Sequence, residues 1–181
     1  ARLAYYRFDG ASATNNKGIA AINTPMTLVG YEETQLILAE TAVRAGKIAE
    51  GITQLNKLRA YLAGGKAFIK LNAADALKYD PYELVDFEKN GIENLDGIAT
   101  DRALLREIIE ERYVSGFTGL LGFDDLRRLG SKEKDIAVLP PFNSTTIKQY
   151  PQRFIVAQSE LSANQNAPVD AGIFSVTEVN R

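Results

Sequence analysis

The sequence predicts a mainly α-helical fold, in which a helical hairpin is joined by further helices and long irregular loops. Three observations predict it. Apolar residues recur at helical spacing on both sides of Gly46, a second strongly helical segment follows at residues 101–113, and strong strand signals are lacking. At 181 residues the chain is long enough to bury a core, and we expect one compact unit over residues 1–181.

The hairpin is predicted at residues 31–62. Its first helix carries an apolar stripe at three- and four-residue spacing, formed by Leu36, Ala39 and Val43, with Leu38, Ala42 and Ala45 beside them. Its second helix repeats the pattern with Ile48, Ile52, Leu55, Leu58 and Leu62. Gly46 stands at the joint, where glycine readily adopts the left-handed conformation that ends a helix. Two helices with so short a joint lie antiparallel and share their apolar faces, as in a single tetratricopeptide-like pair.

A long connection, residues 63–99, follows the hairpin. One short helix is predicted inside it, with Asp80 as its N-cap, Pro81 at its first position and Glu83 at its third. It is expected to end at Asn90, which precedes a glycine. A connection of this length with so little secondary structure is typically functional or disordered.

The strongest helix after the hairpin is predicted at residues 101–113, with Thr100 as its N-cap. One face of this helix carries Leu105, Ile108, Ile109 and Arg112. Glycines then interrupt the helical pattern, at positions 116, 119 and 122. A last helical turn is expected at residues 124–129, ending at Gly130, and the chain beyond Lys132 is expected to be irregular.

Composition excludes several classes of function. The net charge of −2 makes nucleic acid an unfavourable partner, and no apolar run approaches the roughly 20 residues that span a bilayer. The chain has no cysteine and no histidine, so neither a disulfide nor a Ser-His-Asp or Cys-His catalytic group can be assembled from it. No metal site and no cofactor is predicted.

Carboxylates are the remaining candidates for catalysis. Paired acids for glycoside hydrolysis could come from Glu107, Glu110 and Glu111 or from Asp124 and Asp125. Adjacent carboxylates on a helix point in different directions, however, and Arg106 and Arg112 are close enough for ordinary ion pairs. The sequence therefore favours a protein that is not an enzyme.

Aromatic residues interleaved with amides and charged groups indicate a third possibility, sugar binding. A flat aromatic face covers the C–H side of a pyranose, while amide, carboxylate and guanidinium groups bind its hydroxyls. The candidate ligand-binding residues are Tyr6, Arg7, Asp9, Asn72, Tyr79 and Tyr82. The alternative interpretation is that these loop aromatics pack inward as part of the core.

Three segments, in this order and spacing, resemble the C-terminal half of the SusD/RagB family of outer-membrane nutrient-binding lipoproteins. The first segment, residues 36–62, matches the family through Ala39, Glu40, Gly46, Leu55, Asn56 and Arg59. The second, residues 107–128, matches through Glu111, Arg112, Asp125, Leu126, Arg127 and Arg128. The third, residues 150–166, matches through Pro151, Arg153, Glu160, Asn164 and Asn166.

The resemblance implies a SusD-like fold and a non-enzymatic role in nutrient uptake and polysaccharide utilization. Proteins of this family bind oligosaccharides, such as starch-like glycans, at the surface of Bacteroidetes-type bacteria, and they cover a SusC-like TonB-dependent transporter. The chain is then expected to be the C-terminal portion of such a protein, whose missing N-terminal half would carry the lipid anchor to the outer membrane.

The resemblance also assigns a structural ionic network to Glu111, Arg112, Asp125 and Arg127, because a buried charge needs a partner. It transfers no sugar-contacting residue. An alternative function is a peptide- or protein-binding helical scaffold, in which the groove of the hairpin holds a partner chain.

Overall fold

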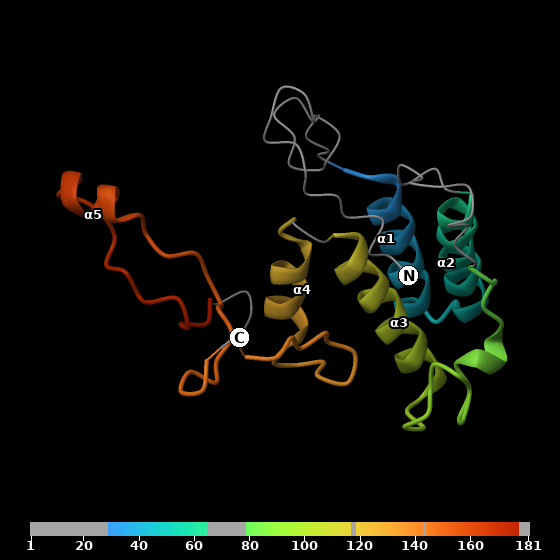
Figure 1. The fold of residues 1–181 in the computed structure, drawn as a ribbon. Helices are drawn as coiled ribbons and strands as arrows, with labels where there is room; N and C mark the ends of the chain where they lie inside the picture. Colours follow the sequence, from blue (N-terminus) through green and yellow to red (C-terminus); the bar gives the residue numbers. More distant parts are fainter. Residues whose placement is uncertain (1–28, 65–78, 117–118, 143, 178–181) are drawn as a thin grey trace, which may run out of the picture.

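The computed structural model describes residues 29–64, 79–116, 119–142 and 144–177. This part of the chain is mainly helical, as predicted, and none of its residues lies in a strand. Its elements are α1 (Tyr31–Arg44), α2 (Ile48–Ala63), the 3₁₀ turn η2 (Leu84–Asp86), α3 (Thr100–Ser115), α4 (Leu121–Leu129) and α5 (Gln158–Ala163). In Figure 1, α1, α2 and α3 lie side by side, α4 stands next to α3, and α5 lies at the far end of an extended arm.

The predicted hairpin is confirmed as α1 and α2. Gly46 has a φ of 77° and makes the left-handed turn between them. The N–H of Gly46 donates to Val43 O at 2.9 Å, and the N–H of Lys47 donates to Ala42 O at 2.9 Å. These two hydrogen bonds form a Schellman motif, which satisfies the carbonyls at the end of α1.

The core lies between the hairpin and α3. Its fully buried side chains include Leu36, Ala39, Leu55, Leu58, Leu104, Ile108 and Ile109. The predicted stripe of α1 is narrower than expected, because Leu38 is 46% exposed and Ala45 lies on the surface. Close contact between α1 and α2 depends on Gly51, where an added Cβ would lie 2.3 Å from Cγ2 of Val43.

The helix predicted to start at Asp80 was wrong. The chain instead forms the short turn η2, whose N-cap is Glu83 in a reciprocal capping box with Asp86. The physical reason lies on α2, where the side-chain amide of Asn56 binds both backbone groups of Tyr82. Asn56 Nδ2 donates to Tyr82 O at 2.8 Å, and the N–H of Tyr82 donates to Asn56 Oδ1 at 2.7 Å. Because these hydrogen bonds hold the backbone at Tyr82 against α2, a helix cannot begin before this residue.

The two later helices follow the predicted pattern with shifted starts. Helix α3 begins at Thr100, so Ala99 rather than Thr100 is its N-cap. Helix α4 begins at Leu121, before the predicted Asp124, and is followed by Gly130 as expected. The described residues beyond Lys132 are irregular apart from short α5.

The arm, residues 140–142 and 144–177, runs out from α4 and returns (Figure 1). Its two passes are joined where the N–H of Gln152 donates to Ile173 O at 2.8 Å and Arg153 Nε donates to Ser175 O at 3.0 Å. Among the described residues, no helix combines the length and apolar character needed to span a membrane.

Candidate functional site

An ionic cluster joins α1, α3 and α4. We call it the Glu40 cluster, and its members are Glu40, Arg44, Arg112, Asp125 and Arg128. Glu40 is bound by all three arginines. Arg44 and Arg128 each approach Glu40 Oε1 to 2.7 Å, and Arg112 approaches Glu40 Oε2. Asp125 forms the second centre, at 2.7 Å from Arg112 and 2.8 Å from Arg128. The cluster therefore holds three helices together through alternating charges.

Burial and charge act in opposite directions on Glu40, whose side chain is only 9% exposed. Burial raises the pKa of its carboxyl, but the hydrogen bonds from Arg128, Arg44 and Arg112 and the positive charge of Arg112 lower that pKa to about 2. Glu40 is therefore ionised at every physiological pH, and its charge is compensated within the protein.

The predicted ionic network, Glu111, Arg112, Asp125 and Arg127, is only partly brought together. Arg112 and Asp125 are paired directly. Glu111 lies 3.9 Å from Arg59 of α2 instead. Arg127 faces Asp124 on its own helix at 3.6 Å and lies over the ring of Phe123. The other partners of Arg112 and Asp125 are Glu40 and Arg128, in place of the predicted Glu111 and Arg127. Glu40 and Arg128 also belong to the matched motifs.

The hydroxyl of Tyr82 lies between two carboxylates. Tyr82 Oη is 2.7 Å from Glu93 Oε1 and 2.9 Å from Glu107 Oε1. Burial raises the pKa of Glu107, the charges of Glu111 and Glu93 raise it further, and the hydrogen bond from Tyr82 lowers it, so that the pKa rests at about 8 instead of 4.5. Burial and the nearby charge of Glu107 also raise the pKa of Tyr82. The carboxyl of Glu107 therefore keeps its proton to a higher pH than an ordinary glutamate does.

Of the predicted sugar-binding residues, the structure describes Tyr79 and Tyr82. Tyr6, Arg7, Asp9 and Asn72 lie outside the described residues. Tyr82 is 9% exposed, and Arg59 lies 3.9 Å above its ring centroid, so its face is covered. Tyr79 is half-buried and packs against the core. The interpretation of Tyr82 as a ligand platform is therefore wrong, and it belongs to the core.

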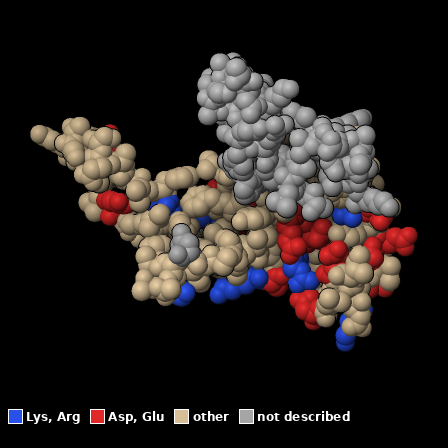
Figure 2. Space-filling model, in the orientation of Figure 1, with Lys and Arg blue, Asp and Glu red and all other residues tan. Residues whose placement is uncertain are grey.

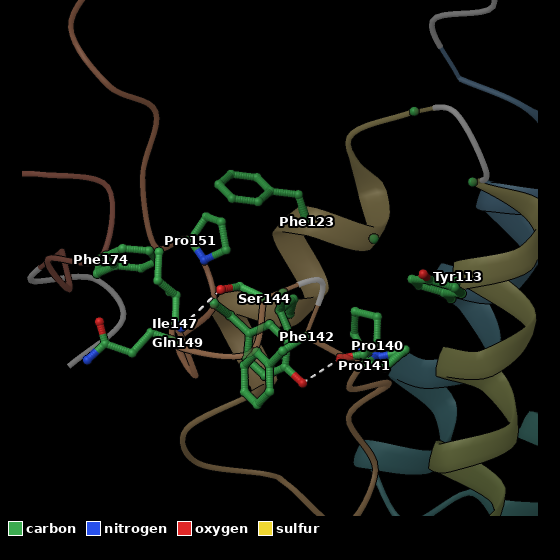
Figure 3. Close-up of a pocket in the computed structure, with 15 residues that line it drawn as sticks. Tyr113, Phe123, Pro140, Pro141, Phe142, Ser144, Ile147, Gln149, Pro151 and Phe174 are labelled. Carbon is green, nitrogen blue, oxygen red and sulfur yellow. Dashed lines mark hydrogen bonds between the residues drawn. The ribbon is translucent and has the colours of Figure 1, made fainter.

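A large cavity lies elsewhere, between α4 and the arm. It has a volume of about 530 Å³ and is lined by the end of α3, by α4, by residues from 140–142 and 144–151, and by Phe174. We call it the aromatic pocket, after its rings: Tyr113, Phe123, Phe142, Tyr150 and Phe174. Figure 3 shows Tyr113, Phe123, Phe142 and Phe174 around the pocket, with Ser144, Ile147 and Gln149 among them.

The position of the aromatic pocket depends on close helix packing. Gly122 of α4 lies against the ring of Tyr113, because a Cβ at Gly122 would be 3.1 Å from the Cδ2 of that ring. On the opposite side Phe142 and Tyr150 stack at 4.6 Å between ring centroids. Tyr150 Oη donates to Pro140 O at 2.6 Å, which fixes this pair against the loop.

Charge is unevenly distributed over the molecule. Figure 2 shows acidic and basic side chains gathered over the helices and the nearby loops, while the arm is mostly uncharged. The arm carries four charged residues, Lys148, Arg153, Glu160 and Asp170. The sequence analysis did not find the aromatic pocket, because its rings come from four separate segments with no common spacing.

Comparisons of this chain with protein-family models, with curated proteins and with solved structures found no match. Among the described residues, no group of three or more carboxylates is arranged to hold a metal ion.

Proposed function

We propose that this chain belongs to a SusD-like protein that binds glycan at the cell surface and works with a SusC-like TonB-dependent transporter of the outer membrane. The observation that carries the proposal is the mutual contact of the residues on which the resemblance rests. Glu40 from the first matching segment binds Arg112 and Arg128 from the second. Residues chosen for a sequence pattern alone have no reason to meet in this way.

The remaining matched residues add support. Asn56 and Arg59, both in the first segment, hold the loop at residues 80–82, since Arg59 Nε donates to Asp80 O at 2.7 Å and Asn56 binds Tyr82. In the third segment Arg153 joins the two passes of the arm, and Asn164 Nδ2 donates to Glu160 Oε1 at 2.6 Å. Asn56, Arg59 and Arg153 therefore act as joints between segments, whereas Asn164 binds within its own segment.

The alternative function, a helical scaffold that holds a peptide in the groove of its hairpin, has less support. The inner faces of α1 and α2 are covered by α3, and Leu36, Leu55 and Leu58 are fully buried. A partner peptide would therefore need another surface of the hairpin.

A glycan panel tests the proposal. The chain should bind at least one polysaccharide in affinity electrophoresis, and it should recover a TonB-dependent transporter when a tagged copy is purified from detergent-extracted outer membranes. A bound peptide or another nutrient, with no affinity for any glycan, would contradict the sugar part. Glycan binding without recovery of a transporter would contradict the uptake part.

A further inference from the structure

Two rings of the aromatic pocket are partly exposed to solvent, although one of them, Phe142, is stacked on Tyr150. Phe142 is 38% exposed and Phe174 is 37% exposed, although both line a cavity of about 530 Å³. This volume is within the range of about 300–1,000 Å³ that is typical of small-molecule sites. Rings that only complete a core are usually covered, as Phe87 is in this protein. The exposed rings therefore indicate a surface on which a flat ligand can lie.

The lining of the aromatic pocket is electrically neutral. No Asp, Glu, Lys or Arg is among the described residues that line it. Two cations outside this lining lie over its rings, with Lys148 Nζ at 5.5 Å from the ring centroid of Phe142 and Arg127 over Phe123. An ionised ligand group would lose its water without gaining a partner in this lining, which is costly. The pocket therefore favours a neutral ligand.

One polar side chain of the lining is available to a ligand. Gln149 is exposed, and its amide has no hydrogen-bond partner in the part of the chain that the structure describes. Two other polar side chains of the lining are engaged, because Tyr150 Oη donates to Pro140 O and Ser144 Oγ accepts from the N–H groups of Thr146 and Ile147. A primary amide can donate to one hydroxyl and accept from its neighbour.

Aromatic faces and one free amide, in a neutral pocket, match the chemistry of a sugar ring. The axial C–H groups of a pyranose form an apolar face, and its hydroxyls both donate and accept. We propose that the aromatic pocket binds one ring of a neutral glycan, with the sugar in contact with the exposed parts of the Phe142 and Phe174 rings and adjacent hydroxyls bound by Gln149. This inference rests on the proposed function and deepens it, since it locates the glycan and excludes uronic and sulfated sugars from the pocket.

The test measures glycan affinity of the whole chain by isothermal titration calorimetry. The neutral probes are maltoheptaose, cellohexaose and xylohexaose, and the charged probe is hexagalacturonate. We expect at least one neutral probe to bind, and Phe142→Ala and Phe174→Ala each to weaken its binding about tenfold, because each removes a ring face. Gln149→Ala should weaken binding less. Tyr31→Ala removes an exposed ring of α1, outside the pocket, and should leave affinity unchanged.

Each of the other outcomes contradicts a stated part of the inference or of the proposed function. If the wild-type chain binds a neutral glycan and the Phe142, Phe174 and Gln149 variants bind it equally well, the location is wrong and the proposed function stands. If only hexagalacturonate binds, the inference that the ligand is neutral is wrong, and the proposed glycan binding stands. If no glycan binds, or an apolar peptide binds instead, both the location and the proposed function are wrong. Because the substituted side chains are exposed, far-ultraviolet circular dichroism should show the wild-type helix content for every variant.

Discussion

Arg112 and Glu40 are 72 residues apart in the sequence, yet the guanidinium of Arg112 donates to the carboxylate of Glu40 in the interior between α3 and α1. Both side chains are less than 10% exposed. Neither charge is stable there without a partner, because moving an unpaired ion from water into a protein costs several kcal/mol. The pair therefore makes the docking of α3 on α1 depend on the identity of both residues and not on apolar burial alone.

Substituting Glu40 tests this dependence. Glu40→Gln keeps the shape of the side chain but removes the negative charge that three arginines share. Arg112 retains Asp125, so we expect a loss of about 3 kcal/mol, at the lower end of the range for a broken buried pair. Urea unfolding followed by circular dichroism measures it. Glu133→Gln is the matched control, since Glu133 also binds two arginines but is 26% exposed, and it should cost less than about 1 kcal/mol. Equal losses in the two variants would contradict the role of burial.

The contact between Asn56 and Tyr82 gives a second prediction. Asn56→Ala leaves the backbone N–H and C=O of Tyr82 without their side-chain partner, and we expect destabilisation of about 2 kcal/mol. Hydrogen exchange of the Tyr82 amide should also become faster. Thr53→Ala, an exposed position on the same helix, is the control and should change stability by less than about 0.5 kcal/mol. Unchanged exchange at Tyr82 in the Asn56 variant would show that the loop is held by other contacts.

Gly51 sets the distance between α1 and α2. Alanine is the better helix former by about 1 kcal/mol, but its Cβ would lie 2.3 Å from Cγ2 of Val43 in the core. We expect the clash to prevail, with Gly51→Ala losing about 1–3 kcal/mol in thermal or urea unfolding. The double variant with Val43→Ala should show favourable coupling, because the smaller side chain removes the clash. Glu50→Ala is the control for helix propensity, and strictly additive losses at positions 43 and 51 would contradict the contact.

The elements that the sequence predicts well are those set by local physics. The stripe of Leu36, Ala39 and Val43 and the glycine at position 46 specify the hairpin, because periodicity and a left-handed turn need no distant partner. The start of the short turn at Leu84 was missed because its backbone is held by Asn56, on another helix.

In the candidate sites, too, contacts within one motif could be predicted from the sequence, whereas contacts between distant segments could not. Arg112 and Asp125 were grouped correctly from one motif, whereas the partnership of Glu40 with Arg112 and Arg128 links two motifs far apart and has no local signal. Aromatic residues were identified as candidate platforms wherever they stood near amides. Whether a ring such as Tyr82 faces the core or a ring such as Phe142 faces solvent depends on tertiary packing, which the spacing of aromatics does not encode.

The hydroxyl of Tyr82 gives a last prediction, about pH. A phenol has one proton to donate, and both Glu93 and Glu107 lie within hydrogen-bond distance of its oxygen. If both carboxylates were ionised, one of them would face the phenol oxygen without a hydrogen bond. A proton on Glu107 resolves this conflict. The surrounding charges are those of Glu93, Glu110 and Glu111, with Arg59 near Glu111 and over the tyrosine ring.

The pKa of Glu107 is about 8 in the folded chain and 4.5 as the ordinary value. Between these values the folded state binds more protons than the unfolded state, so this group's contribution is complete below about pH 4.5 and is lost as pH rises through 8. Glu107→Gln mimics the protonated acid, so the free energy of unfolding of the variant should fall less steeply between pH 5 and pH 9. The difference in this free energy, variant minus wild type, should be at least about 1 kcal/mol larger at pH 9 than at pH 5. Urea midpoints at successive pH values measure it. Glu88→Gln, exposed in the neighbouring loop, should keep the wild-type slope, and a Glu107 variant with that same slope would show that no proton is held at this site.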